Sequence, residues 1–209
     1  GKSAFEGCRK IKSLDLAGLF PGLKSIGDRA FAGCTALLDL TLPGSLFYMG
    51  YGVFAGCRCL SSVKFHPEET GEKAAGRKID GKLFENCREL AGPDGFIIIG
   101  NVCYGCLDDR WEISVPEGVR AVSSGAFREM EMCRKIILPD SVRAVGYGAF
   151  RDCSHLEEIR LPAAVRDLGK DPFEGCSALL TVVAPGTEPE KFPEPMAALS
   201  GFCAHADKY

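Results

Sequence analysis

Residues 28–34 read Asp-Arg-Ala-Phe-Ala-Gly-Cys and residues 147–153 read Tyr-Gly-Ala-Phe-Arg-Asp-Cys, and this short pattern decides the fold. Variants of it place a phenylalanine at the same position in seven copies: Phe5, Phe31, Phe54, Phe84, Phe127, Phe150 and Phe173. Successive phenylalanines are 26, 23, 30, 43, 23 and 23 residues apart. Repetition at roughly 20 to 50 residues is typical of a solenoid, whose units bury their apolar faces only against their neighbours. A solenoid presents a long surface rather than a pocket, so the pattern favours binding over catalysis.

The residues around each phenylalanine predict the elements of one repeat. In the second copy the apolar and turn positions are Phe31, Cys34, Leu37, Leu40, Leu42 and Pro43. Leu40-Thr41-Leu42 alternates apolar and polar residues, which predicts a short strand that the following proline ends. An apolar pair eight and five residues before each phenylalanine predicts a second extended segment. A glycine then leads the chain into a short helical or 3-10 piece that carries the Ala-Phe pair.

The two longest gaps between phenylalanines have local causes. Residues 68–73 are polar and predict a surface loop within the 30-residue gap. In the 43-residue gap, two apolar runs flank Gly100-Asn101, which predicts an inserted β-hairpin at about residues 95–106. The strand pattern resumes at Ile113 and Val115.

These repeats resemble the BspA-like leucine-rich repeat family, whose units run roughly L-x-x-I-x-L-P-x-x-V-x-x-I-G-x-x-A-F-x-x-C. The resemblance covers about residues 4–185, and the inserted hairpin is similar to a segment common in bacterial members. It implies an α/β solenoid, a right-handed leucine-rich-repeat coil with a β-strand and a short helical or 3-10 turn in each repeat of about 23 residues. It also implies a repetitive protein of gut or oral bacteria or of mucosal protists, often at the cell surface, that acts in adhesion or protein binding. The family offers no catalytic residues to carry over.

The repeat predicts one solenoid domain over residues 1–185 with a continuous core. Residues 186–209 differ in composition: a rigid connector rich in Pro and Glu precedes a short apolar helix at about 196–202. This helix either caps the solenoid, which is the favoured interpretation, or begins a further region. The chain opens in mid-repeat at Lys2, with neither a capping unit nor a secretion signal, so we expect the natural protein to extend upstream.

Composition narrows the classes of partner and activity. Apolar residues make up 46% of the chain without a long uninterrupted hydrophobic run, which predicts no membrane span. The net charge of −3, with acids and bases interspersed, argues against nucleic acid as the main partner. The sequence contains no Walker loop, no G-x-S-x-G and no H-E-x-x-H pattern. We therefore expect a non-enzymatic monomer without a cofactor.

Six of the eleven cysteines share one inward position, three residues after the phenylalanine: Cys8, Cys34, Cys57, Cys87, Cys153 and Cys176. Met130 takes this position in the fifth copy, where Cys133 replaces the usual leucine. A free cysteine packs as a small hydrophobic residue. Adjacent coils lie close enough for disulfides, but a position filled once per coil predicts buried, unpaired thiols.

Cys103-Tyr104-Gly105-Cys106 has the C-x-x-C spacing of redox pairs and of half a zinc site. A redox cysteine belongs at a helix N-terminus, whereas Cys103 lies on the predicted hairpin. A zinc site needs a second pair of ligands. The three histidines show no matching spacing: His66, His155 and His205. Incidental packing is the favoured interpretation, also for Cys57-Arg58-Cys59, and thiol or zinc chemistry is the alternative.

The position seven residues before the phenylalanine is basic in five of six copies: Lys24, Phe47, Arg77, Arg120, Arg143 and Arg166. Stacking aligns these residues into a stripe. Arg120, Arg143 and Arg166 come from consecutive coils, so we expect them to be neighbours about 5 Å apart. Long arginine stems that cover sheet surface explain the stripe without a ligand. The alternative is a docking stripe for an acidic glycan, a polyphosphate or an acidic peptide, to which Tyr48 adds an aromatic contact.

Two functions of different kinds remain open. The first is an adhesin-like module, at the cell surface or secreted as the resemblance implies, that binds a protein or an acidic glycan. The second is an intracellular protein–protein interaction scaffold, which the unpaired cysteines and the missing export signal favour. An enzyme that uses Cys103 and Cys106 is the least favoured interpretation.

Overall fold

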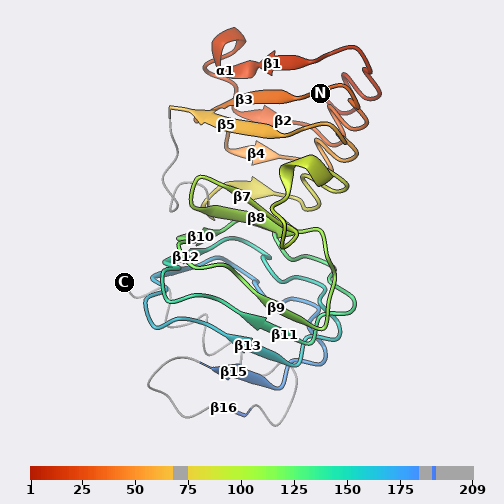
Figure 1. The fold of residues 1–209 in the computed structure, drawn as a ribbon. Helices are drawn as coiled ribbons and strands as arrows, with labels where there is room; N and C mark the ends of the chain where they lie inside the picture. Colours follow the sequence, from red (N-terminus) through yellow and green to blue (C-terminus); the bar gives the residue numbers. More distant parts are fainter. Residues whose placement is uncertain (68–74, 184–189, 192–209) are drawn as a thin grey trace.

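The computed structural model describes residues 1–67, 75–183 and 190–191. They form a β-solenoid of about seven turns, whose coils stack from the N-terminal to the C-terminal end of one elongated body (Figure 1). The strands form two rows along this body. Row 1 consists of β1 (Ser13–Asp15), β3 (Asp39–Pro43), β5 (Ser62–His66), β9 (Glu112–Ser114), β11 (Lys135–Ile137), β13 (Glu158–Arg160), β15 (Thr181–Val183) and β16 (Glu190–Lys191). Row 2 consists of β2 (Ser25–Ile26), β4 (Tyr48–Met49), β6 (Lys78–Ile79), β7 (Phe96–Ile99), β8 (Val102–Cys106), β10 (Ala121–Val122), β12 (Ala144–Val145) and β14 (Asp167–Leu168).

Each row is divided into two sheets. Row 1 contains the sheets β1-β3-β5 and β9-β11-β13-β15-β16, and row 2 contains β2-β4-β6 and β7-β8-β10-β12-β14. Strands of successive coils pair in parallel at equivalent repeat positions, for example Ile136 with Ile159. β16 pairs antiparallel with β15 inside the predicted connector. The rest of residues 186–209, including the predicted terminal helix, lies outside the described residues.

The turn that carries each phenylalanine is not helical, which differs from the short helical piece that we expected. In the Phe150 turn, Gly148 has a φ of 54° and Asp152 a φ of 60°, and the other turns have positive φ at the same two positions. L-residues rarely adopt this conformation, and a right-handed helix does not contain it. The helices with described bounds are α1 (Leu16–Leu19) and the 3-10 helix η1 (Arg88–Leu90). The fold is therefore a β-solenoid with little helix, and the α/β character is not confirmed.

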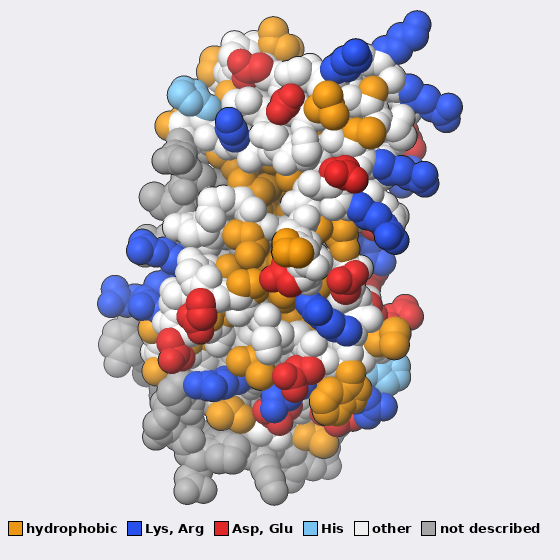
Figure 2. Space-filling view, viewed as in Figure 1, with side chains coloured by type: hydrophobic (Ala, Val, Ile, Leu, Met, Phe, Trp, Pro, Cys, Tyr) orange, Lys and Arg blue, Asp and Glu red, His pale blue; other side chains and the backbone are white. Residues whose placement is uncertain are grey.

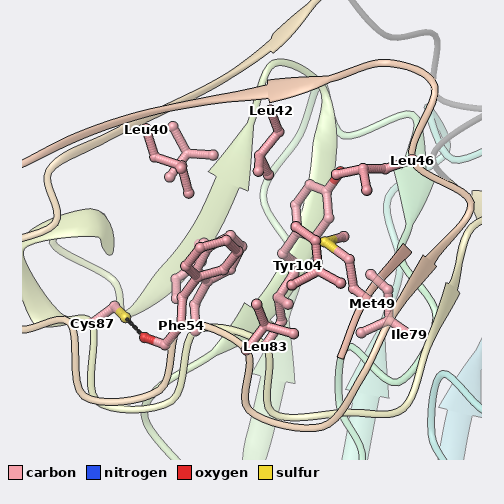
Figure 3. Close-up of a cluster of buried hydrophobic side chains, with 14 of the residues drawn as sticks. Leu40, Leu42, Leu46, Met49, Phe54, Ile79, Leu83, Cys87 and Tyr104 are labelled. Atoms are coloured by element: carbon pink, nitrogen blue, oxygen red, sulfur yellow. Dashed lines mark hydrogen bonds between the residues drawn. The ribbon is translucent and has the colours of Figure 1, made fainter. Parts of the chain in front are cut away.

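The phenylalanines and cysteines form two adjacent columns inside the coils. Phe150 stacks between Phe127 and Phe173, with ring centroids 5.7 and 5.4 Å away. The Cys87 thiol donates to the Phe54 carbonyl of the preceding coil at 3.1 Å (Figure 3). The same bond, at 2.9 to 3.2 Å, joins Cys34 to Phe5, Cys57 to Phe31, Cys153 to Phe127 and Cys176 to Phe150. The cysteine position is thus a hydrogen-bonded packing position, and all ten described cysteines are free.

The predicted hairpin is confirmed as β7 and β8, and it divides the core. β8 points Val102 and Tyr104 into the core cluster of the N-terminal coils, and Cys103 into the cluster of the C-terminal coils. In Figure 1 the hairpin lies between the upper and lower coils. Tyr104 meets Phe84 edge to face at 5.9 Å, where the next phenylalanine of the column would stand. The predicted continuous core is therefore two clusters with a shared hairpin between them.

We predict that the buried thiols resist modification in the folded protein. Burial raises the pKa of Cys57 and Cys87 to about 12, and the thiolate is the reactive species. A disulfide-exchange reagent at pH 8, applied to a Cys203→Ser variant, should react fast with the exposed Cys59 and more slowly with the half-buried Cys8 and Cys106. Denaturation should release the seven buried cysteines. Disulfides found among the repeated cysteines by mass spectrometry of the native protein would contradict this prediction.

Candidate functional site

The three consecutive arginines of the predicted stripe are neighbours on the surface. The Arg143 amide donates to the Arg120 carbonyl, and the Arg166 amide to the Arg143 carbonyl, each at 2.8 Å. All three side chains are exposed and lie directly before β10, β12 and β14. Within the described ranges none of them forms an ion pair. One guanidinium nitrogen of Arg143 donates to the carbonyls of Asp140 and Val142, at 2.7 and 3.1 Å. We call these three residues the arginine ladder.

The N-terminal residues of the predicted stripe lie beside a different sheet, β2-β4-β6. Lys24 is exposed and its carbonyl accepts from the Phe47 amide at 2.9 Å, and the Phe47 side chain is 64% exposed. Tyr48 is half-buried, and its hydroxyl donates to Asp80 at 2.5 Å. This hydrogen bond is the main reason why the pKa of Tyr48 rises to about 12. A continuous stripe from Lys24 to the arginine ladder is thus not formed, because the hairpin separates the two sheets.

Arg77 was predicted to lie on this stripe, and that prediction is wrong. Its side chain is 1% exposed. Its Nε donates to the Leu46 carbonyl at 3.0 Å, and its guanidinium lies 4.4 Å from the centre of the Phe65 ring. A second nitrogen donates to the Tyr104 hydroxyl at 3.4 Å. A buried charge is tolerated when acceptors and a ring satisfy it, and here they come from distant parts of the chain that register arguments do not reveal.

The C-x-x-C pair does not have the surroundings of a redox site. Cys103 is fully buried on β8, and burial raises its pKa to about 12. Cys106 is half-buried, and burial likewise raises its pKa. A redox nucleophile requires the opposite shift. Neither cysteine is in a disulfide, and the described part of the chain contains no group of three or more residues able to hold a metal ion. This arrangement favours packing as the role of the pair.

A cleft that the sequence did not indicate lies where the two halves of the solenoid meet. It has a volume of about 450 Å³ and is lined by residues 82–86, 88, 91–93, 95, 97, 104–109, 125–126 and 128–130. Its floor includes Phe84, Ile97 and Tyr104, which are all buried. The 43-residue gap between Phe84 and Phe127 was the available signal, because a repeat that is interrupted by an insertion does not stack regularly.

The repeat pattern of the BspA type leucine rich repeat region matches six copies in this chain, over residues 1–92 and 77–190. The chain belongs to the BspA-type leucine-rich repeat family. This family assignment confirms the resemblance seen in the sequence and accounts for the β-solenoid. No curated protein matches the chain.

Solved structures of other leucine-rich repeat proteins are similar to this BspA-type chain. The Treponema protein TpLRR (T. pallidum) is 27% identical, with 78% of this chain and 64% of that chain covered and a TM-score of 0.37. A protein from Bacteroides ovatus is 26% identical, with 86% and 50% covered and a TM-score of 0.40. A protein from Eubacterium ventriosum is 18% identical, with 78% and 58% covered and a TM-score of 0.42. The chain thus spans between half and two thirds of these proteins.

In residues 1–67 and 75–183, no helix has both the length and the apolar character needed to cross a membrane.

Proposed function

We propose that this solenoid is a non-enzymatic interaction module with an adhesin-like role, and that the arginine ladder binds an acidic partner. The observation that carries the proposal is the pair of backbone hydrogen bonds that join Arg120 to Arg143 and Arg143 to Arg166, three residues of neighbouring coils that are all exposed. Leucine-rich repeat proteins of this family are typically protein-binding surface proteins. A flat solenoid surface suits a long partner that contacts several coils at once.

Electrostatics supports an anionic partner. Three guanidinium groups one coil apart repel each other weakly in water, and a polyanion relieves this repulsion while gaining bidentate contacts. Such binding depends on the summed field of the arginines, so it should weaken steeply as salt is added. The side chains of Arg120 and Arg166 form no hydrogen bond or ion pair within the described ranges, so their guanidinium groups do not have to leave a protein partner before they bind an anion.

We predict that the variant Arg120→Glu, Arg143→Glu, Arg166→Glu loses affinity by about tenfold or more, since each exposed ion pair contributes up to about 1 kcal/mol and reversal adds repulsion. The measurement is binding at low salt to an array of sulfated, uronic-acid and phosphate-rich polymers and acidic peptides. The free energy of unfolding should change by only about 0.5 kcal/mol per site, because these are surface positions.

A matched control separates the ladder from net charge. Lys12, Lys64 and Arg160 are exposed and form no ion pair in the described residues. Reversing these three to Glu makes the same change in total charge and should leave most of the binding intact. If both triple variants lose binding equally, or if the wild-type protein binds nothing on the array, the ladder is a solvated sheet edge.

A further inference from the structure

Backbone hydrogen bonds join the phenylalanine turns of successive coils in a regular pattern, which we call the turn pairing. Where two neighbouring coils pair regularly, the amides of three residues at every second position of one turn donate to three carbonyls of the next turn. From the Phe54 turn, the amides of Gly52, Phe54 and Gly56 donate at 3.1, 3.0 and 2.7 Å. The same triplet links the Phe127 turn to the Phe150 turn, at 2.8 to 3.0 Å. The turn pairing resembles the hydrogen bonding between strands and runs along the side of the solenoid.

The turn pairing is interrupted between the Phe84 turn and the Phe127 turn. The equivalent amides of Lys82, Phe84 and Asn86 donate no hydrogen bond to any group in the described ranges. The two turns touch at one end, where a Cβ on Gly125 would lie 3.2 Å from the Cα of Gly81. Both turns line the cleft of about 450 Å³, the first with Lys82, Phe84 and Asn86 and the second with residues on either side of Phe127. An amide without a partner is costly unless it meets water or a ligand.

The far wall of the cleft is already in close contact with the hairpin. Gly105 lies so near the Phe127 turn that a Cβ on it would be 2.8 Å from the Ala126 carbonyl oxygen. The hairpin therefore occupies one side of the interruption, and the Phe84 turn, whose three unpartnered amides belong to residues that line the cleft, occupies the other. An extended chain presents a carbonyl to one side at every second residue, which matches amides at residues 82, 84 and 86.

The side chains that line the cleft include more carboxylates than basic groups. The Lys82 ammonium is held by Glu129 at 2.8 Å, and Arg128 is held by Glu129 and Asp152 at 3.2 and 3.3 Å. Glu85, Asp108 and Arg88 are exposed on the rim and have no ion-pair partner among the described residues, so two free carboxylates stand beside one free guanidinium. Figure 2 shows hydrophobic side chains grouped in the middle of one face of the molecule, with both acidic and basic side chains beside them. An apolar floor with a carboxylate rim is complementary to a peptide that carries both apolar and basic residues.

We propose that this cleft binds an extended peptide segment of a partner protein, which pairs with the Phe84 turn as an added strand and places a Lys or Arg beside Glu85 and Asp108. Main-chain bonds to the three free amides supply sequence-independent affinity, as in other cases of strand addition. The buried floor at Phe84, Ile97 and Tyr104 selects an apolar residue, and the carboxylates select the basic one. This site is separate from the arginine ladder, so either proposal can fail without the other.

The first experiment uses a display library of random seven-residue peptides as the probe. Wild-type protein should enrich peptides with Lys or Arg close to an apolar residue, and the cleft-filling variant Gly92→Trp should not. Gly92 lines the cleft and a side chain can be added there, since only the Asp94 carboxylate and the Phe96 carbonyl lie nearby. Gly22→Trp is the matched control, because nothing lies within 4 Å of that position. No enrichment, or the same enrichment by Gly92→Trp, would overturn the proposal.

The second experiment tests the charge. A synthetic copy of the enriched peptide should bind the double variant Glu85→Lys, Asp108→Lys at least about tenfold more weakly than the wild type. Glu112→Lys, Glu117→Lys makes the same charge change at two exposed positions outside the cleft and should bind like the wild type. If both double variants lose affinity equally, the peptide responds to net charge and not to this rim.

The third experiment reports the main-chain contact directly. Amide hydrogen exchange by NMR should be fast at Lys82, Phe84 and Asn86 in the free protein and at least about tenfold slower with the peptide bound. The Phe150 amide already donates to the Pro172 carbonyl at 3.0 Å, so its exchange should not change. Unchanged exchange at the three cleft amides in a saturated complex would show that the peptide does not add as a strand.

Discussion

Replacing Phe150 with alanine should lower the free energy of unfolding by about 3–5 kcal/mol, the cost of emptying a large aromatic site in a core. Phe150 is fully buried and stacks on a phenylalanine in each neighbouring coil. Its amide donates to the next coil, and its carbonyl accepts the Cys176 thiol at 3.0 Å. The cavity would therefore loosen both coil interfaces, and a solenoid has no other contacts to compensate.

Urea unfolding followed by circular dichroism measures this loss. Phe47→Ala is the matched control, because its side chain is 64% exposed and its loss should change stability by about 0.5 kcal/mol or less. Amide exchange should accelerate first in the Phe127 and Phe173 turns and last in the N-terminal coils. A loss below about 1 kcal/mol would mean that the phenylalanine column does not hold the coils together.

The sequence was sufficient for the features that repeat. The fixed spacing of phenylalanine and cysteine predicted the two inner columns, since only an inward position keeps its residue type from coil to coil. The hairpin was also predictable, because Gly100-Asn101 between two apolar runs is a local signal. The turn conformation was not predictable: Gly148 marks one positive-φ position, but Arg29 and Asp152 adopt positive φ without a distinctive residue type.

The residues of the candidate sites also differ in whether the repeat pattern predicts their positions. The adjacency of Arg120, Arg143 and Arg166 follows from a regular 23-residue period, and the structure places them as expected. Arg77 has the same register, yet the hairpin and Phe65 surround it, so its burial depends on contacts between distant segments. For the cleft, the sequence offers only the 43-residue gap between Phe84 and Phe127, which marks an interruption of the repeat but does not show which backbone hydrogen bonds are left unmade.

Tyr104→Ala should have an effect of similar size, about 3–5 kcal/mol, and should also separate the unfolding of the two halves. Tyr104 is 7% exposed and connects three groups of the N-terminal cluster: its ring packs on Phe84 and Phe65 at 5.9 and 6.2 Å, and its hydroxyl accepts from Arg77. Because it stands on β8, whose neighbouring residue Cys103 belongs to the C-terminal cluster, it links the two clusters through one strand.

Two signals distinguish the halves during unfolding. Trp111, the single tryptophan, precedes β9 in the C-terminal half and is 59% exposed, and its carbonyl accepts from the Arg134 and Lys135 amides of the next coil. The change in fluorescence as these contacts break therefore reports that half, whereas circular dichroism reports both. In the wild type the two urea transitions should coincide, and in Tyr104→Ala the circular dichroism should begin to change at lower urea than the fluorescence. Tyr104→Phe keeps the ring and removes the hydroxyl that accepts from Arg77, so it should cost about 1 kcal/mol and keep the transitions together. Coincident transitions in Tyr104→Ala would show that the hairpin does not couple the halves through this residue, and that nearest-neighbour contacts elsewhere at the joint hold them together.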